Sequence, residues 1–147
     1  MGAYRTVVVG TDGSDSSMRA VEKAAQIAGA EAKLIVASAY LPQHEDARAA
    51  DALRDESYKV SGTAPIYAIL RDAKDRAHAA GAQNIDERPI VGAPVDALVH
   101  LADEEQADLL VVGNVGLSTI AGRLLGSVPA NVSRRAKTDV LIVHTTT

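Results

Sequence analysis

Five short extended stretches recur along this chain, separated by segments with helical spacing, and this alternation restricts the fold more than any other feature. Four are mostly apolar, at residues 6–10, 34–39, 108–112 and 139–144, and a more polar one spans residues 84–91. Strands that are apolar on both sides belong in a parallel sheet that helices cover on both faces. The alternation therefore predicts an α/β fold with right-handed crossovers. Pro89 predicts that the polar strand lies at a sheet edge.

The segments between these stretches predict four helices. The first follows a polar turn at residues 11–17 and ends at Gly29, and the second is capped by Thr63 and ends at Gly81. The third starts at Pro94, and the fourth runs from Ser127 to about residue 136. The apolar stripe expected on the third helix consists of Val95, Leu98, Val99 and Ala102. Residues 41–62 are charged with weak helical spacing, which leaves a mobile flap or a short surface helix as alternatives.

Length and composition restrict the class of protein. A chain of 147 residues without an internal repeat predicts one domain over residues 1–147. The lack of cysteine excludes disulfides, zinc–thiolate sites and thiol nucleophiles. A net charge of -4 and only 3% aromatic residues argue against nucleic acid as a partner. No stretch suits a signal region or a membrane span, so we expect a cytoplasmic protein that does not bind membranes.

A glycine-rich segment follows the fourth strand and precedes the last helix. It contains Gly113, Gly116 and Gly126, and Ser127 stands at the expected helix start. Glycines let backbone N–H groups approach a ligand closely, and a helix N-terminus offers unpaired donors with a partial positive charge. The segment therefore predicts an anion site, most simply for phosphate. The alternatives are an ordinary long loop and a serine that only caps the helix. Arg123, the one cation of the segment, is either a phosphate partner or solvated.

The first strand ends in a second glycine-containing turn, Gly10-Thr11-Asp12-Gly13. Ligands of parallel α/β sheets bind at the carboxyl ends of the strands, where the strand order reverses. Because the first and fourth strands both end in such turns, we expect them side by side at that point. Asp12 is then a candidate ligand residue, with an ordinary turn residue as the alternative. Ser14 and its next two neighbours are expected to cap the first helix.

These residues resemble the universal stress protein family, in its nucleotide-binding subgroup. The spacing Gly113-x-x-Gly116, nine residues, then Gly126-Ser127 fits the family pattern G-2x-G-9x-G-(S/T). The opening Val-Val-Val-Gly-Thr-Asp-Gly-Ser, the Gly-Ala-Pro turn at residues 92–94 and the closing Asp-Val-Leu-Ile-Val also match, so the resemblance covers the chain except residues 41–62. It implies a Rossmann-like fold of the adenine nucleotide alpha hydrolase type. That fold is an open parallel sheet of five strands in the order 3-2-1-4-5, with helices on both faces.

The resemblance also implies where a nucleotide would bind. Asp12 would meet the ribose hydroxyls or the adenine edge, with Gly10 and Thr11 beside it in the same turn. The adenine pocket would be lined by Ala37, Ala39 and Val112. The phosphates would be held by Gly113, Gly116, Gly126 and Ser127, with Val128 following at the helix start.

The family is usually dimeric through its last strand. The resemblance therefore implies a homodimer formed by the strand from Asp139 to His144, and His144 is expected to face the partner. An edge strand with unpaired N–H and C=O groups independently favours such pairing.

The identity of the nucleotide stays open between ATP and a smaller one, AMP or cyclic AMP. The glycine segment has no P-loop lysine, so ATP would rely on amides and possible Mg²⁺, whereas a less charged nucleotide suits an amide cradle better. No residue is a convincing general base and none of the 4 histidines has metal-ligand spacing, so no catalytic or metal-binding residue is named. We expect a stress-response regulator, nucleotide sensor or buffer that acts by binding. The alternative is a slow ATP-hydrolysing or phosphotransfer enzyme of the same fold.

Overall fold

The computed structural model describes residues 4–40, 64–114, 132 and 134–144 of the chain. Its helices and strands are, in chain order, β1 (Thr6–Gly10), α1 (Asp15–Ala28), β2 (Lys33–Tyr40), α4 (Ala64–Ala79), β3 (Asn84–Val91), α5 (Pro94–Glu104), β4 (Leu109–Gly113) and β5 (Asp139–Val143). Val132, Arg134 and Arg135 are also helical, in agreement with a last helix before β5.

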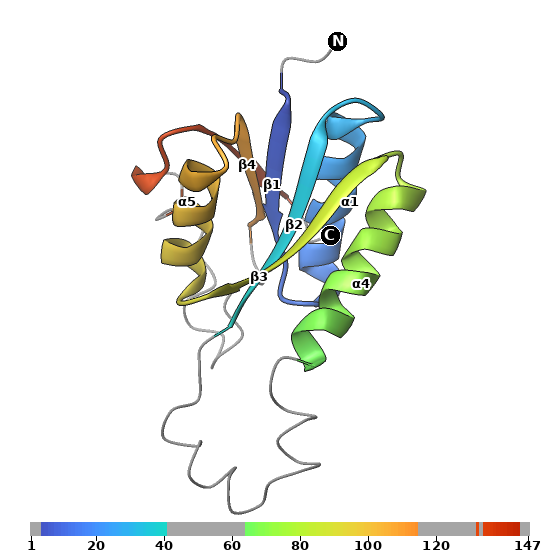
Figure 1. Cartoon of the computed structure of the whole chain (residues 1–147), viewed down its shortest axis with the longest axis horizontal. Helices are drawn as coiled ribbons and strands as arrows, with labels where there is room; N and C mark the ends of the chain where they lie inside the picture. The colour runs from blue at the N-terminus through green and yellow to red at the C-terminus, as the bar shows by residue number, and fades with distance from the viewer. Residues whose placement is uncertain (1–3, 41–63, 115–131, 133, 145–147) are drawn as a thin grey trace, which may run out of the picture.

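The strands form one 5-stranded sheet in the order β3-β2-β1-β4-β5, and every pairing is parallel (Figure 1). The central strand β1 places Gly10 beside Ala37 of β2 and Val9 beside Val111 of β4. The predicted α/β fold, its strand order and the neighbouring first and fourth strands are therefore confirmed. β3 is an edge strand, as Pro89 predicted.

Helices cover both faces of the sheet (Figure 1). Val7 and Val9 of β1 point to the face on which α1 and α4 pack, and Val8 points to the face covered by α5 and Val132. The side chains of all three valines are fully buried. This burial on both sides explains why the central strands are continuous apolar runs instead of alternating ones.

Helix α5 starts where the sequence predicted, whereas α1 starts at Asp15, within the turn expected over residues 11–17, and one helical stripe was partly wrong. Ser14 caps α1 by accepting a hydrogen bond from the Ser17 backbone N–H, and Pro94 is the first residue of α5. The buried side of α5 consists of Ala97, Leu98, Leu101 and Ala102. Val95 and Val99, which were expected in this stripe, are half-buried at its flank. The helix turns its smaller alanines toward the sheet, which brings its axis closer to β1 and β2 than the valines would allow.

Several expectations fall on parts of the chain outside the described residues. These are the flap or surface helix at residues 41–62, the cap at Thr63, and the glycine segment from Gly116 to Ser127 with the following Val128. Within the described ranges, no helix is both long enough and apolar enough to cross a membrane.

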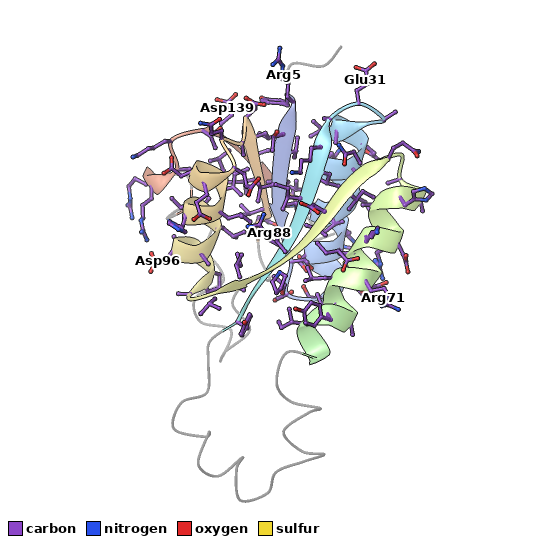
Figure 2. All side chains as sticks on the ribbon, in the orientation of Figure 1. Arg5, Glu31, Arg71, Arg88, Asp96 and Asp139 are labelled. Carbon is purple, nitrogen blue, oxygen red and sulfur yellow. The ribbon has the colours of Figure 1, made fainter. Side chains whose placement is uncertain are left out.

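Asp108, expected as the first residue of the fourth strand, instead links the amino ends of β1 and β4. Its carboxylate accepts hydrogen bonds from the backbone N–H groups of Arg5, at 2.8 Å, and Thr6, at 3.0 Å. These two donors stabilise the charged form and lower the pKa of Asp108. Figure 2 shows Arg5 at this end of the sheet together with Glu31 and Asp139, opposite the carboxyl ends of the strands.

A second charged link ties the end of α5 to β3. The guanidinium of Arg88 donates to the carboxylate of Glu105 at 2.8 Å, and Lys33 of β2 lies 4.0 Å from the same carboxylate (Figure 2 labels Arg88). The hydrogen bond from Arg88 is the main cause that lowers the pKa of Glu105. Both acids therefore gain from staying ionised in the folded chain.

We expect Asp108→Asn to lower the unfolding free energy at neutral pH. We also expect the unfolding free energy of the variant to fall less steeply than that of the wild type as the pH is lowered. A carboxyl group with a lowered folded pKa contributes stability above its unfolded pKa and loses it as the pH falls through the folded value. For Asp108 this loss begins near the ordinary value of 3.8. The variant keeps one acceptor oxygen but no charge, so we expect about 1 kcal/mol less unfolding free energy at pH 7.

Urea unfolding across a pH series would measure this effect. Asp103→Asn, which neutralises an exposed carboxylate on α5, is the matched control and should leave the acid limb unchanged. An acid limb in Asp108→Asn as steep as that of the wild type would contradict the assigned role.

Candidate functional site

A small hollow lies at the carboxyl ends of β1 and β2, where β1 leads into the turn before α1. Its lining residues are Gly10, Thr11, Asp12, Ala37, Ala39, Pro94 and Leu98. The enclosed volume is about 20 Å³, which accommodates a small polar group or the edge of a ring but not a whole nucleotide. Five sequence-predicted residues, from two strands and a turn, thus meet at one place beside the start of α5.

The turn after β1 is held against β2 by its backbone. The N–H of Thr11 donates to the carbonyl of Ala37 at 2.9 Å, which extends the strand pairing by one residue. Gly13 follows with φ of +89°, a conformation that glycine adopts without strain, and a Cβ there would stand 3.0 Å from Ile69 of α4. Strand pairing on one side and close packing against α4 on the other therefore fix the path of the turn.

Asp12 has one satisfied and one unsatisfied carboxylate oxygen. Its Oδ1 accepts from the backbone N–H of Ser14, at 2.9 Å, and from the hydroxyl of Ser17, at 3.0 Å. Its Oδ2 is buried and receives no hydrogen bond from any residue that the structure describes. A buried acceptor without a donor is costly, and a ligand hydroxyl or amino group would relieve that cost.

Helix α5 approaches β1 closely at this hollow. A Cβ built on Gly10 would stand 2.7 Å from Cδ1 of Leu98 and 3.1 Å from its Cδ2. Leu98 is 2% exposed, so neighbouring atoms restrict its movement. Glycine at position 10 is thus required by the distance between helix and strand, and Pro94 sets where that helix begins.

The carboxyl end of β4 lies beside that of β1, because Val111 pairs with Val9. Val112 is fully buried in the core under α5, and Gly113 ends the strand. The next residue, Asn114, donates its backbone N–H to the carbonyl of Val143 at 2.9 Å. Its side-chain nitrogen lies 3.3 Å from Nδ1 of His144, so this histidine contacts the first residue after the strand within its own chain.

The structure therefore brings part of the predicted site together. Gly10, Thr11, Asp12, Ala37 and Ala39 line one hollow, and Val112 and Gly113 end the neighbouring strand. The predicted phosphate residues Gly116, Arg123, Gly126, Ser127 and Val128 lie outside the described residues. Sequence reasoning did not assign Pro94, Leu98 and Ser17 to the site.

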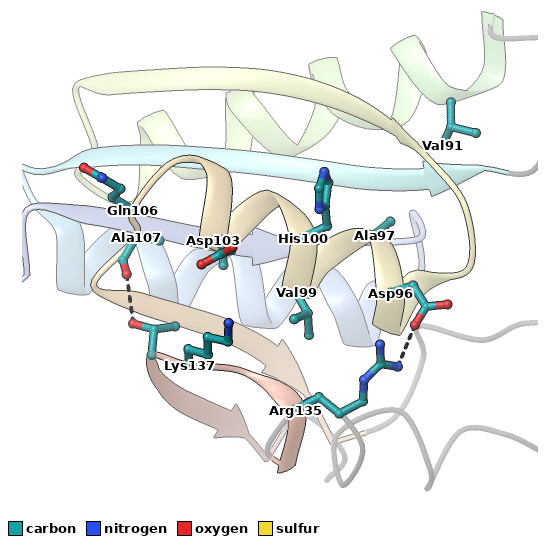
Figure 3. A pocket seen from close by; sticks show the side chains of 12 residues that line it. Val91, Asp96, Ala97, Val99, His100, Asp103, Gln106, Ala107, Arg135 and Lys137 are labelled. Atoms are coloured by element: carbon teal, nitrogen blue, oxygen red, sulfur yellow. Dashed lines mark hydrogen bonds and ion pairs between the residues drawn. The ribbon is translucent and has the colours of Figure 1, made fainter.

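A larger cavity of about 770 Å³ runs along α5, and none of the predicted nucleotide residues that the structure describes lines it (Figure 3). One wall is α5 with Val99 and Asp103, and the other is the segment before β5 with Lys137. An ion pair of 2.5 Å between Arg135 and Asp96 joins the two walls at one end. Because its polar lining is largely exposed and paired, its size does not make it a better candidate than the smaller hollow.

The groups available for metal binding are few. Among the described residues, no cluster of three or more histidine, cysteine, aspartate or glutamate side chains could hold a metal ion. His100 of α5 contacts Glu104 on the same helix at 3.1 Å. The described site therefore offers backbone amides, hydroxyls and one carboxylate.

The fold and the position of these residues define a doubly wound α/β domain whose candidate ligand-binding residues lie at the topological switch point. A family model described as the universal stress protein family matches residues 3–144. The chain belongs to the universal stress protein family.

Two curated relatives show the range of similarity. Universal stress protein Rv1636 of Mycobacterium tuberculosis is 87% identical over 146 residues, which cover 99% of this chain and 100% of the relative. Universal stress protein YxiE of Bacillus subtilis is 30% identical, over 96% of this chain and 99% of its own.

Two solved structures are also similar. A universal stress protein crystallised in complex with cAMP has a TM-score of 0.76 and 68% identity, over 99% of this chain and 100% of its own. The crystal structure of Rv1636 has a TM-score of 0.63 and 73% identity, over 99% of both chains.

We expect Gly10→Ala to destabilise the fold by about 1–3 kcal/mol, because the added methyl group overpacks the contact with Leu98. Urea unfolding would measure the loss. In a Leu98→Val background, which lacks the two δ carbons, the same substitution should cost clearly less. Equal costs in the two backgrounds would show that the close approach of α5 is not the reason for glycine at position 10.

Proposed function

We propose that this chain binds an adenine nucleotide at the carboxyl ends of β1, β2 and β4. The observation that carries the proposal is the buried, unsatisfied Oδ2 of Asp12 in the hollow beside Ala37 and Ala39. A ribose hydroxyl is a neutral donor that would satisfy this oxygen, in a charge-assisted hydrogen bond. The relative crystallised with cAMP supports an adenine nucleotide as the donor of that hydroxyl.

Each part of the nucleotide would meet a different part of the site. The edge of the base would enter beside Ala37 and Ala39, and the ribose would lie at Asp12. The phosphate would lie toward Gly113 and the predicted cradle of Gly116, Gly126 and Ser127. Backbone amides at such a cradle bind phosphate without requiring a lysine.

Cyclic AMP is the nucleotide we favour over ATP. Among the described residues, the lining of the hollow includes one carboxylate and neither lysine nor arginine. Such a lining disfavours a highly charged triphosphate unless Mg²⁺ accompanies it, whereas a cyclic monophosphate carries much less negative charge. The solved relative in complex with cAMP supports cyclic AMP as a ligand. AMP and ATP with Mg²⁺ are the competing ligands.

Binding without turnover is the activity that the site favours. Hydrolysis would need a group that removes a proton from an attacking water. Asp12 is the one acid that lines the hollow, and one of its oxygens is already engaged by Ser14 and Ser17. We therefore propose a nucleotide sensor or buffer with one domain over residues 1–147, and we retain slow ATP hydrolysis as the alternative.

Calorimetric titration with cyclic AMP, AMP and ATP, each with and without Mg²⁺, would test the proposal. We expect cyclic AMP to bind most tightly and without a need for Mg²⁺. Asp12→Asn should weaken its binding by about 10- to 100-fold, because an amide nitrogen replaces an acceptor that faces the ribose. Gly126→Ala should also weaken binding if the cradle holds the phosphate, and an unchanged melting temperature would show that the fold is intact.

Different results would separate the alternatives. Mg²⁺-dependent binding of ATP in preference to cyclic AMP would justify assays for hydrolysis or phosphotransfer. A folded wild-type protein that binds none of the three nucleotides would contradict the proposed function.

We also propose that the chain forms a homodimer through β5. The described strands place β5 at an edge of the sheet, paired only with β4. The carbonyl of Val143 points toward β4, since it accepts from Asn114. Because successive residues of a strand point to opposite sides, the N–H and C=O of Ile142 face outward, and its side chain is 41% exposed. A second copy of this edge is a suitable partner for these groups.

Ile142→Pro should therefore give a monomer, because proline removes an outward N–H but not one that pairs with β4. Sedimentation velocity would compare it with Ile142→Ala, which keeps the N–H and should remain dimeric. A wild-type protein that is monomeric at every concentration, or an Ile142→Pro variant that stays dimeric, would contradict pairing through β5.

A further inference from the structure

Ser17 occupies the centre of the turn that carries Asp12. It is the third residue of α1, its exposed fraction is 0%, and it lines neither of the two cavities described above. Its hydroxyl oxygen lies 2.7 Å from Oγ1 of Thr11, 3.2 Å from the backbone nitrogen of Asp12 and 3.0 Å from Oδ1 of Asp12. The Ser17 hydroxyl thus contacts both the backbone and the side chain of Asp12.

The proton of the Ser17 hydroxyl can be assigned by counting donors. The N–H of Asp12 can only donate, so it occupies one lone pair of the Ser17 oxygen. Thr11 Oγ1 accepts from the N–H of Gly13 at 3.0 Å, and the other acceptor within reach of its own proton, Sδ of Met18 at 3.9 Å, is weak. The hydroxyls of Thr11, at 2.7 Å, and of Ser14, at 3.2 Å, are therefore both available to fill the second lone pair of Ser17. With both lone pairs filled, Ser17 acts as a donor.

Two acceptors are within reach of this proton. The carbonyl of Ser14 lies 3.0 Å from the Ser17 oxygen but already accepts from the N–H of Met18 at 2.9 Å. Oδ1 of Asp12 lies at the same distance, 3.0 Å, and is charged, so it is the stronger acceptor. Together with the N–H of Ser14, the Ser17 hydroxyl holds Oδ1 from two sides. The carboxylate cannot rotate without breaking one of these bonds, and its Oδ2 is thereby held toward the hollow.

We propose that Ser17 is a positioning residue for the ribose: it does not touch the nucleotide, but it orients the Asp12 carboxylate that does. The inference rests on the proposed function and adds the cause of its selectivity for a ribose hydroxyl. Without the Ser17 hydroxyl, the N–H of Asp12 and the hydroxyl of Thr11 both lose a buried acceptor, and the carboxylate is free to turn toward them. Its orientation for the ligand is then lost while the charge remains.

The test compares two ligands that differ by one hydroxyl group. In cyclic AMP the 2′-hydroxyl is the only free hydroxyl of the ribose, and 2′-deoxy cyclic AMP lacks it. We expect the wild-type protein to prefer cyclic AMP by about tenfold or more, because a hydrogen bond to a charged group is lost with the hydroxyl. In Ser17→Ala this preference should fall to less than about threefold, mainly through weaker binding of cyclic AMP, with the deoxy ligand little affected.

Ser14→Ala is the matched control. It removes a hydroxyl from the same helix start and loses the cap, which should lower the melting temperature. It retains both the N–H of Ser14 and the hydroxyl of Ser17 as donors to Asp12, so the preference for cyclic AMP should remain. A purely structural effect of Ser17 would weaken both ligands alike, as general destabilisation does.

A second pair of variants keeps the test valid if Ser17→Ala does not fold. Ser17→Thr and Ser17→Val have nearly the same shape and the same added bulk, but only threonine carries a hydroxyl. We expect threonine to retain the preference for cyclic AMP and valine to lose it. Circular dichroism and melting temperature would establish that the compared variants are folded.

The possible failures are distinguishable. A wild-type protein that binds neither ligand overturns the proposed function and this inference with it. Equal binding of both ligands by the wild type leaves nucleotide binding in place but overturns the role of Ser17. A full preference for cyclic AMP in Ser17→Ala, or an equal loss for both ligands, also overturns that role alone.

Discussion

The two parallel pairings of β1, with β2 on one side and with β4 on the other, are the constraint on which the structure depends. From β1 the chain crosses to β2 and β3 over the face of α1 and α4, and from β3 it returns to β4 over the face of α5. The chain therefore passes from β1 to α1 on one face, whereas Val132, which follows β4 in the sequence, packs on the other face. The strand order thus reverses between β1 and β4, and ligands of such sheets bind at the carboxyl edge of that point. Because β1 is buried on both faces and paired on both edges, its polar turn can meet a ligand only at that edge.

This position imposes a strict requirement on the polar groups of the turn. Thr11 and Ser17 are buried, so each of their hydrogen-bonding groups needs a partner inside the protein. They meet this requirement mainly with each other and with Asp12, and the one described oxygen left over is Oδ2 of Asp12. The buried hydrogen-bonding groups of this turn are paired with one another except for one acceptor oxygen. That oxygen can be satisfied by a donor that belongs to a ligand. The same hydrogen bonds that stabilise the start of α1 thus select the part of a ligand that can enter.

Much of the fold could be predicted because the strands repeat a simple pattern. Residues 34–39 and 109–112 are apolar runs that are buried on both sides, and Pro89 marks an edge because proline lacks a ladder donor. Asp108 was expected to begin the fourth strand, but it lies one residue before β4. A side chain that caps the amino end of a neighbouring strand has the same sequence context as the first residue of a strand, so the two roles look alike in the sequence. The role of Asp108 depends on residues about a hundred positions away, which no local pattern contains.

The site was predictable at its glycines and at Asp12, and less so elsewhere. Gly10 and Gly13 break the apolar and helical patterns, so they stand out in the sequence. Leu98 does not, because its contact with Gly10 depends on how closely α5 packs against β1.

The role of Ser17 could not be recognised from the sequence, because Ser14 and Ser16 stand close to it. Five polar residues precede it in the turn and each is of a type that can cap a helix, but only the folded turn shows which hydroxyl reaches Asp12.

The comparison of the two cavities shows why chemistry is the better criterion for the site. The cavity of about 770 Å³ along α5 is large enough for a nucleotide, yet two of its charged groups, Arg135 and Asp96, already form an ion pair with each other. The hollow of about 20 Å³ is far smaller but contains an acceptor that nothing described satisfies. A ligand that donates a hydrogen bond to a buried, unsatisfied acceptor removes the desolvation penalty that the free protein carries, and this favours binding. An ion pair whose partners already satisfy one another offers no such gain. The unsatisfied oxygen of Asp12 is therefore the stronger reason to place the ligand at the switch point.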